Sequence, residues 1–319
     1  MSDALFLACA ALWGLLAVAW LTGVRRLSCW RPSAKDYLFP LLPLLLLGAL
    51  AALAPPALAG FWRPLARSGL VIWGWLSLVW VASVLRRDSS LMDLGYALCV
   101  VFSVWLQWIW GGADSSPRAL LILVLVNLWG WRYTAYIAAR NLPRGEDTRY
   151  ARWRARTGAA WWWWSYFQVF LLQAVLIWIW TLPLTLALAA PGPIGALETL
   201  ATAVWLVGFV FEAGADWQLA RFKRDPSRKG RVLDQGLWSQ CRHPNYFGEA
   251  AIWCAYGLLA LAHPAGWIGL FASAYTVHMM NGGSATRMTD AYLMKTRPAY
   301  ADYARRTPAF LPRVFGGRP

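Results

Sequence analysis

The sequence predicts an all-α fold, a polytopic bundle of about nine transmembrane helices with the N-terminus outside and the C-terminus in the cytoplasm. Three observations lead to this prediction. The 319-residue chain is 59% hydrophobic. Its apolar residues gather in runs of about 17 to 25, the length that crosses a bilayer. Its 30 Lys and Arg residues concentrate in every second connection between these runs.

Each predicted segment is a continuous apolar run bounded by charged or turn residues. The runs cover residues 4–24, 37–59, 69–85, 91–110, 117–139, 165–189, 195–215, 246–262 and 265–283. The connections that carry 26 of the 30 cations are 25–36, 86–90, 140–160, 216–245 and the tail from 284. Since positively charged loops stay on the cytoplasmic side, this asymmetry sets the predicted orientation.

The composition argues against two other classes of protein. A net charge of +15 is compatible with nucleic-acid binding, but the cations flank apolar helices and no soluble domain presents them. We therefore expect no nucleic-acid partner, and the run Trp161 to Trp164 fits an aromatic belt at the membrane interface. The five cysteines show no metal-ligand spacing, so we expect neither a metal site nor a disulfide framework.

The sequence shows no linker between folded domains, because Pro and Gly cluster only at short turns such as 191–195. We expect residues 61–319 to form one domain, preceded by an extra pair of helices in residues 1–60. The first apolar run follows Asp3 without a basic region, which favours a retained helix over a cleaved signal.

The stretch Gly236 to Glu249, GLWSQCRHPNYFGE, gathers polar side chains directly before an apolar run. These side chains are Arg242, His243, Asn245, Tyr246 and Glu249. Because Pro244 is favoured only in the first turn of a helix, we expect the helix to begin near Asn245, whose amide would cap it. Such an end favours anions. Each residue alone fits an interfacial belt or a cap, but a carboxylate one turn beyond Asn245 is costly in hydrocarbon, so together they indicate a site.

Other ionisable residues inside or beside the apolar runs are few. Glu212 and Asp216 are four residues apart on one helix face, and Lys223 lies about two turns further, which indicates a hydrated polar channel. Arg132 lies about two turns deep in the fifth run, and we expect a buried partner for it. Asp93 is a candidate partner, although an acid in a first turn also stabilises its own helix.

Several of these motifs resemble the steroid 5-alpha-reductase family. GLWSQCRHPNYFGE and the preceding EAGADWQLARFK are similar to its C-terminal catalytic domain, and more distantly to sterol reductases. SLMDLGY, NLWGWRYTAYIAAR, EDTRY and YADYARRTPAFLP resemble its bacterial branch. The resemblance covers roughly residues 93–312. It implies a membrane enzyme that uses NADPH to reduce the carbon-carbon double bond of a 3-oxo-delta-4 steroid or similar enone lipid.

The resemblance also implies a cofactor site between the helix bundle and the cytoplasmic loops. The resemblance assigns seven residues to NADPH, namely Arg132, Glu212, Asp216, Lys223, Arg231, Asn245 and Glu249. Five more residues are our further candidates for cofactor binding, namely Arg242, His243, Tyr246, Arg287 and Tyr292. Asn245 and Glu249 match the asparagine and glutamate of the family's NFLGE-like segment, and Arg132 matches an arginine at the nicotinamide end. No GxGxxG fingerprint occurs, so this binding would not use a Rossmann fold.

The chain departs from the animal members at the proton donor. They hold the substrate carbonyl with a glutamate and a tyrosine, and by the Arg132 register the tyrosine position is Trp129 here. The catalytic candidates are Asp93, Trp129 and Tyr133. We expect Asp93 to act as the donor, because a carboxyl group at the edge of an apolar cavity can stay protonated and donate to the carbonyl oxygen.

The physical requirements agree with this function. Enone reduction needs a hydride, a hydrogen-bond donor at the carbonyl oxygen and a proton. Membrane lipids supply an apolar lipid or steroid substrate and the cytoplasm supplies NADPH, so we expect an integral protein of a bacterial inner membrane with its active site facing the cytoplasm.

Two other functions stay open. Isoprenylcysteine methyltransferases also carry an RHP-x-Y-x-G segment, which binds S-adenosylmethionine. A non-catalytic protein that binds a lipid or sterol would keep the same fold. The cations Lys223, Arg231 and Arg242 favour NADPH, because a cofactor rich in phosphate needs them.

Overall fold

The computed structural model describes residues 18, 60–281 and 284–318. In this part of the chain every regular element is a helix, which confirms the all-α prediction. The predicted segments 4–24 and 37–59 lie outside the described residues, apart from the single position 18. The chain divides into two compact units, residues 1–191 and 192–319, at the Pro- and Gly-rich turn.

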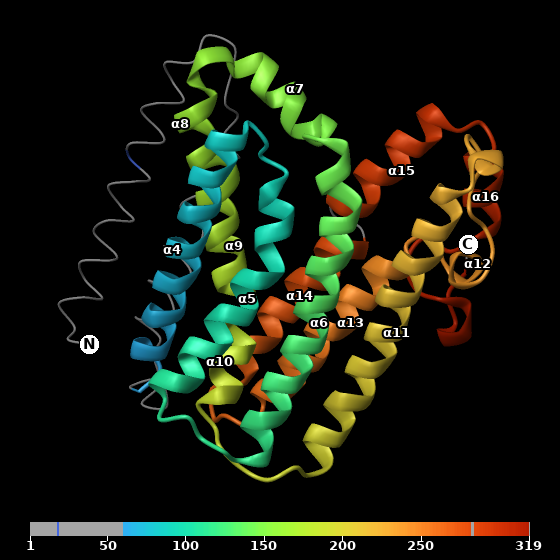
Figure 1. The fold of residues 1–319 in the computed structure, drawn as a ribbon. Helices are drawn as coiled ribbons and strands as arrows, with labels where there is room; N and C mark the ends of the chain where they lie inside the picture. Colours follow the sequence, from blue (N-terminus) through green and yellow to red (C-terminus); the bar gives the residue numbers. More distant parts are fainter. Residues whose placement is uncertain (1–17, 19–59, 282–283, 319) are drawn as a thin grey trace. The chain divides into compact units, whose positions relative to one another are not determined.

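Unit 1 is built on three consecutive helices, α4 (Trp62–Arg86), α5 (Leu91–Trp110) and α6 (Pro117–Asn141). α5 packs against both α4 and α6, and the short turns between them make neighbours antiparallel (Figure 1). The rest of unit 1 comprises η2 (Leu142–Arg144), α7 (Thr148–Thr157), η3 (Gly158–Ala160), α8 (Trp161–Ser165), the π-helical segment η4 (Tyr166–Leu171), α9 (Leu172–Trp180) and α10 (Leu182–Leu188).

Five helical runs among the described residues are long and apolar enough to cross a membrane. They are Arg63–Arg86, Leu91–Trp110, Pro117–Arg144, Thr148–Trp180 and Ala196–Arg224. They support the predicted integral membrane protein. The predicted run 165–189 has the wrong bounds. The helical run extends from Thr148 to Trp180 and α10 follows separately, because Pro183 has no N–H to donate and breaks the helix near Thr181.

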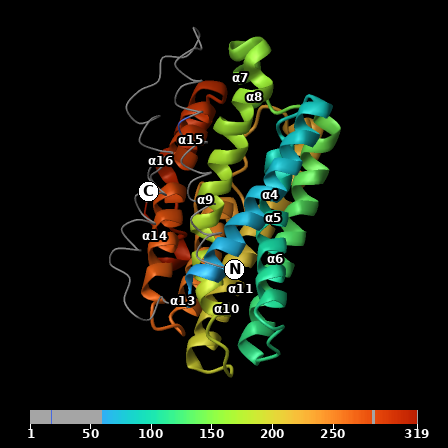
Figure 2. The same cartoon turned by 90° about the vertical axis from the view of Figure 1, so that its left-hand side faces the viewer.

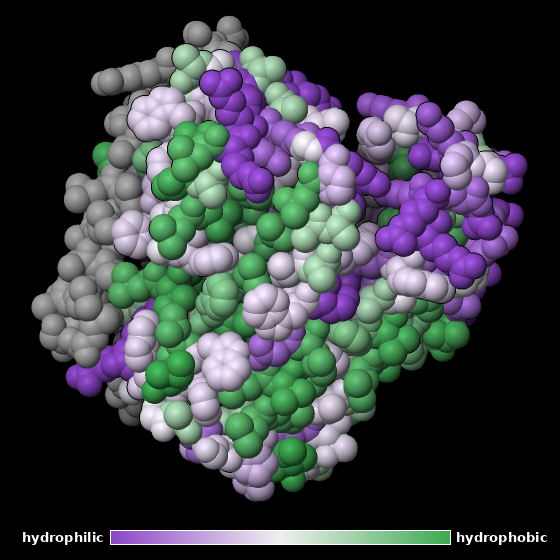
Figure 3. Space-filling view, viewed as in Figure 1, coloured by the Kyte–Doolittle hydropathy of each residue, from purple (hydrophilic) through white to green (hydrophobic). Residues whose placement is uncertain are grey.

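Unit 2 is built on α11 (Ala196–Arg224), α13 (Pro244–Ala260) and α14 (Trp267–Asn281). α13 packs against both α11 and α14 (Figures 1 and 2). The shorter elements are η5 (Pro226–Arg228), α12 (Leu237–Gln240), α15 (Ser284–Thr296), α16 (Tyr300–Arg306) and η6 (Arg313–Phe315). Hydrophilic side chains gather at the end of this unit that carries α12 and α16, whereas hydrophobic ones cover the lower part of α11 (Figure 3).

The helices of unit 2 differ in length from the predicted segments. α11 continues nine residues beyond the predicted 195–215 segment, to Arg224, because the chain meets no Pro until Pro226. α13 has 17 residues and α14 has 15, both fewer than the about 20 that cross a bilayer. The count of nine spans therefore stays a prediction.

The backbones of α11 and α13 approach each other closely at two glycines. A Cβ atom on Gly248 would lie 2.4 Å from the backbone nitrogen of Glu212 and 2.5 Å from the carbonyl oxygen of Gly208. A Cβ atom on Gly208 would lie 2.7 Å from the carbonyl oxygen of Gly248. Small residues are what allow membrane helices to pack this closely. The two glycines thus fix the spacing and register of α11 against α13.

We expect Gly248→Ala to destabilise the protein, because the added methyl group meets backbone atoms that cannot move aside independently. Overpacking of this kind costs about 1–3 kcal/mol. Thermal unfolding of the purified protein in detergent would measure the loss. Gly74→Ala in α4 is a matched control, since nothing lies within 4 Å of a Cβ atom there. Equal melting temperatures for the two variants would contradict the proposed close approach.

Candidate functional site

A cluster of polar side chains, three buried and one half-buried, lies where α11 packs against α13. We call Glu212, Asp216, Asn245 and Glu249 the carboxylate cluster. The amide nitrogen of Asn245 donates to a carboxylate oxygen of Asp216 at 3.4 Å. Glu212, Asp216 and Glu249 are buried, with 2%, 5% and 7% of their surface exposed. The close packing at Gly248 places Glu212 beside the residue that precedes Glu249.

Buried aromatic residues with polar groups line the neighbouring turns of the same helices. The indole nitrogen of Trp253 donates to a carboxylate oxygen of Glu249 at 2.9 Å, and Trp205 of α11 donates to the hydroxyl group of Tyr256 at 3.1 Å. All three of these aromatic side chains are buried. A carboxylate inside an apolar helix pair needs such donors, because an isolated charge there is costly. Trp253 therefore supplies such a donor to the carboxylate of Glu249.

The helix start that carries this cluster differs from the prediction. α13 begins at Pro244, with His243 in the N-cap position and no side-chain cap. The prediction that Asn245 caps the helix is thus wrong. Proline fits the first helical position, which moves the start one residue earlier. Asn245 then lies inside the first turn, where its amide faces Asp216 across the helix pair.

A second cluster, centred on Asp290 of α15, holds the RHP segment. One carboxylate oxygen of Asp290 lies 3.0 Å from the guanidinium of Arg242, and the other lies 2.7 Å from the imidazole of His243. The hydroxyl group of Tyr300 also donates to Asp290. His243 stacks on Tyr246, whose hydroxyl group lies 3.1 Å from that of Thr289. We call Arg242, His243, Asp290 and Tyr300 the Asp290 cluster.

The Asp290 cluster is tied to the C-terminal tail through Arg242. Its guanidinium donates to the carbonyl oxygens of Ala304 and Thr307, both at 2.8 Å, and its backbone N–H donates to Pro308 at 2.8 Å. Tyr303 of α16 donates to the carbonyl oxygen of Trp238 at 2.5 Å. The segment before α13 and the tail are therefore bound together as one structure.

The local electrostatics of the Asp290 cluster favour a carboxylate. Burial alone would raise the pKa of Asp290, but the hydrogen bonds from His243, Tyr300 and Arg242 hold that pKa well below its ordinary value. Burial and the adjacent Asp290 charge raise the pKa of Tyr300. Burial also raises the pKa of the Cys241 thiol, to about 12. Asp290 is thus an anion and Tyr300 a neutral donor at physiological pH.

The remaining predicted residues of unit 2 are exposed. These are Lys223 and Arg231, which flank the end of α11, and Arg287 and Tyr292 of α15. The carbonyl oxygen of Arg231 accepts a hydrogen bond from Arg297 at 2.6 Å, which ties the 225–236 loop to the end of α15. Three predicted cofactor cations, Lys223, Arg231 and Arg287, are therefore exposed in unit 2.

The predicted catalytic residues lie in unit 1. Asp93 accepts hydrogen bonds from Arg149 at 3.1 Å and from the hydroxyl group of Tyr150 at 3.0 Å, instead of pairing with the predicted partner Arg132. The EDTRY segment reaches Asp93 because α7 begins beside the start of α5, where the backbone of Asp147 also donates to Ser90.

Trp129 and Tyr133 belong to an aromatic cluster in the same unit. Trp129 is fully buried. The ring of Tyr96 lies 5.8 Å from that of Trp129 and 5.7 Å from that of Tyr133, in edge-to-face geometry. The guanidinium of Arg132 lies 5.8 Å from the ring centre of Tyr133. Trp129 lies three residues before Arg132 and four residues before Tyr133, so the helix periodicity of α6 places the three side chains on one side of that helix.

Sequence reasoning missed Asp290 and Tyr300. The available signal was that Asp290 is the only acid in SATRMTDAYLMKT, a segment that otherwise carries cations. Among the described residues, no group of three or more His, Cys, Asp and Glu side chains could hold a metal ion.

Two comparisons relate the chain to known proteins. Residues 79–307 match the family described as "Protein of unknown function (DUF1295)". A stretch of 87 residues is 30% identical to the cobalt-zinc-cadmium resistance protein CzcN of Cupriavidus metallidurans. That stretch is 27% of this chain and 38% of CzcN, so the match spans well under half of this curated relative.

We expect Asp290→Asn to lower the free energy of unfolding by about 1.5–3 kcal/mol at neutral pH, because charge-assisted hydrogen bonds to Asp290 are lost. Since the folded-state pKa of Asp290 lies below its unfolded value, its contribution is complete above about pH 4 and declines as the pH falls further. Chemical unfolding at several pH values would test this. The difference between wild type and variant should narrow below about pH 4. A difference independent of pH would contradict it, and Asp302→Asn at an exposed position of α16 is the control.

Proposed function

The chain belongs to the DUF1295 family, which includes steroid 5-alpha-reductase-like membrane proteins, and we propose that it is an NADPH-dependent reductase of an enone lipid such as a 3-oxo-delta-4 steroid. The observation that carries this proposal is the contact between the buried Asp216 and the half-buried Asn245, with the buried Glu212 and Glu249 each one turn away. Buried carboxylates in a pair of membrane helices are costly, and a bound polar ligand is a physical reason to keep them.

The residues of unit 2 fit the chemistry of NADPH. The acids of the carboxylate cluster accept hydrogen bonds, which the ribose hydroxyl groups and the carboxamide N–H groups donate. Asn245 can both donate and accept. The exposed cations Lys223, Arg231 and Arg287 suit the phosphates. When bound, NADPH would supply the hydride for reduction of a double bond.

Two predicted cofactor residues receive a different role. The donors of Arg242 and His243 are directed at Asp290 and at carbonyl groups of the tail. A phosphate would have to displace these contacts before it could bind either residue. We therefore assign Arg242 and His243 to holding α15 and the tail in place. This leaves the exposed cations as the proposed phosphate ligands.

The same structure changes our ranking of the proton donors. Both carboxylate oxygens of Asp93 accept hydrogen bonds from α7, one from Arg149 and the other from Tyr150, so the group is engaged within unit 1. Tyr133 is half-buried in α6, and its ring centre lies 5.8 Å from the guanidinium of Arg132 and 5.7 Å from the ring of Tyr96. We propose that Tyr133 donates to the carbonyl oxygen of the substrate, ahead of Asp93 and Trp129. Asp93 then positions α7 through Arg149 and Tyr150.

We also propose that the ends of α11 and α13 that carry Lys223 and Asn245 face the cytoplasm of a bacterium, where NADPH is available. This follows from the positive-inside distribution of cations and the nine-span topology that it predicts. A reporter protein that works only in the cytoplasm should be active when it is fused to the C-terminus. A periplasmic C-terminus would overturn the proposed site.

Titration of the detergent-solubilised protein with NADPH and with S-adenosylmethionine tests the cofactor. We expect NADPH to bind. Asp216→Asn and Asn245→Ala should each weaken binding by about 1–3 kcal/mol, since a buried polar group loses its partner. Glu198→Gln is a matched control, because Glu198 is a buried carboxylate at the other end of α11 that binds the backbone of Gly195. Binding of S-adenosylmethionine alone would favour a methyltransferase, and binding of neither would favour a non-catalytic lipid-binding protein.

The rate of NADPH consumption with enone lipids tests the donor. Tyr133→Phe should lower the rate about a hundredfold while NADPH affinity changes little, because only the hydroxyl group is lost. Tyr136→Phe, three residues further along α6, is the matched control. Asp93→Asn should have a smaller effect on the rate. A hundredfold loss in Asp93→Asn with a normal rate in Tyr133→Phe would return the donor role to Asp93.

A further inference from the structure

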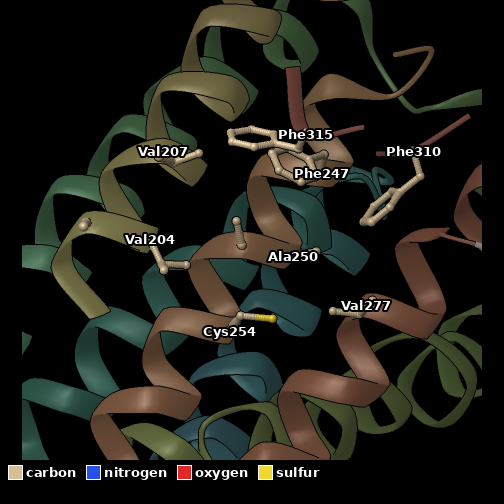
Figure 4. Close-up of a pocket in the computed structure, with 10 residues that line it drawn as sticks. Val204, Val207, Phe247, Ala250, Cys254, Val277, Phe310 and Phe315 are labelled. Atoms are coloured by element: carbon tan, nitrogen blue, oxygen red, sulfur yellow. The ribbon is translucent and has the colours of Figure 1, made fainter. Parts of the chain in front are cut away.

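An apolar pocket lies in unit 2, on the face of α13 opposite the carboxylate cluster. Its volume is about 430 Å³. It is lined by Val204 and Val207 of α11 and by Phe247, Ala250 and Cys254 of α13 (Figure 4). Helix periodicity separates residues 247, 250 and 254 from residues 245 and 249, which carry the polar groups. The pocket and the carboxylate cluster are therefore distinct sites on the two faces of one helix.

The pocket is closed at one end by aromatic rings. Phe315 of η6 stacks on Phe247 at 5.7 Å, and Phe310 lies 5.9 Å from Phe247. At the other end lies Cys254, seven residues along α13 from Phe247, which is about 10 Å at the rise of an α-helix. Figure 4 shows the aromatic rings at one end and the Cys254 thiol at the other. An apolar space of this length suits a hydrocarbon chain.

The pocket adjoins a surface that would face lipid. α11 is one of the candidate membrane spans, and the side chains of Leu206, Val207 and Val210 beside the pocket are exposed. Exposed apolar side chains on a membrane helix contact the acyl chains of the bilayer. A lipid chain can thus enter the pocket from the side without crossing water.

An exposed cation belongs to the same short helix as Phe315, one of the rings at the aromatic end of the pocket. Arg313 lies two residues before Phe315 in η6, and its side chain is exposed. Its guanidinium donates to the carbonyl oxygen of Arg306, and no carboxylate forms an ion pair with it among the described residues. An exposed guanidinium binds phosphate through paired hydrogen bonds. The charge is therefore available to an anionic group at the mouth of the pocket.

We propose that this pocket binds one anionic glycerophospholipid of the bilayer, with an acyl chain along Ala250 and Cys254 and the phosphate beside Arg313. The arrangement offers such a lipid both parts that it needs, an apolar chamber that Phe247, Phe310 and Phe315 line and an exposed cation two residues before Phe315. A neutral sterol would fill the chamber but make no use of Arg313. The proposal does not depend on the reductase activity, since it involves neither the carboxylate cluster nor the donors of unit 1.

Native mass spectrometry of the delipidated full chain in detergent tests the proposal, with phosphatidylglycerol and phosphatidylcholine of identical acyl chains as probes. We expect one phosphatidylglycerol to bind about fivefold more tightly than phosphatidylcholine, the effect of one cation near a lipid head group. Ala250→Trp should fill the pocket and weaken the binding of both lipids at least tenfold. Arg313→Gln should lower the affinity for phosphatidylglycerol to the affinity for phosphatidylcholine.

Matched controls separate these effects from general damage. Val124→Trp adds the same side chain on an exposed position of α6, and Arg305→Gln removes an exposed cation of α16. Both should bind lipid like the wild type. Unchanged lipid binding in Ala250→Trp would overturn the pocket, and a preserved preference for phosphatidylglycerol in Arg313→Gln would overturn the head-group assignment.

A second measurement serves if Ala250→Trp does not fold. Maleimide labelling of Cys254 in the wild-type protein, located by peptide mass spectrometry, should slow at least fivefold when phosphatidylglycerol is added. Labelling that is equally fast with and without lipid would overturn the proposal. Labelling that is blocked even in the delipidated protein would mean that the chain's own residues fill the pocket, which would also overturn it.

Discussion

The contact between Gly208 of α11 and Gly248 of α13 is the constraint on which the rest of unit 2 depends. Backbone atoms of the two helices meet there with no room for a Cβ atom. This spacing brings the amide of Asn245 within reach of Asp216 and sets Glu212 against the turn that carries Glu249. A wider separation would leave these polar groups facing hydrocarbon, where each would cost several kcal/mol. Packing and polarity are therefore coupled in this helix pair.

The Asp290 cluster extends this order to the segments outside the membrane helices. A single carboxylate meets Arg242, His243 and Tyr300, which come from the start of α13 and the start of α16. Arg242 then fixes the tail through two carbonyl groups. A charge network of this kind is strong only when each member is paired, and the lowered pKa of Asp290 reflects that pairing. The network holds the cation-rich loops next to the proposed cofactor site.

α13 thus separates two chemical environments. One face carries Asn245 and Glu249 toward buried acceptors and donors, and the other carries Phe247, Ala250 and Cys254 toward an apolar pocket. A membrane enzyme that combines a water-soluble cofactor with lipid ligands needs both environments within a short distance. The proposed reductase uses the polar face, and the proposed lipid site uses the apolar face.

Local pattern along the chain was enough to predict a helical membrane protein, because the length of an apolar run and the period of a helix are properties of neighbouring residues. It also placed Glu212, Asp216 and Lys223 on one helix. The partners of Asp93, Arg242 and His243 could not be predicted in this way. They lie 47 to 57 residues distant, apart from the carbonyl groups that Arg242 meets still further along the chain. Such contacts leave no periodic signal, since they arise when whole helices dock and bury charges that must then find a partner. Only the tertiary structure therefore decided the partners of Arg242 and His243, two predicted cofactor-binding residues, which both contact Asp290 of α15, while Arg242 also contacts the C-terminal tail.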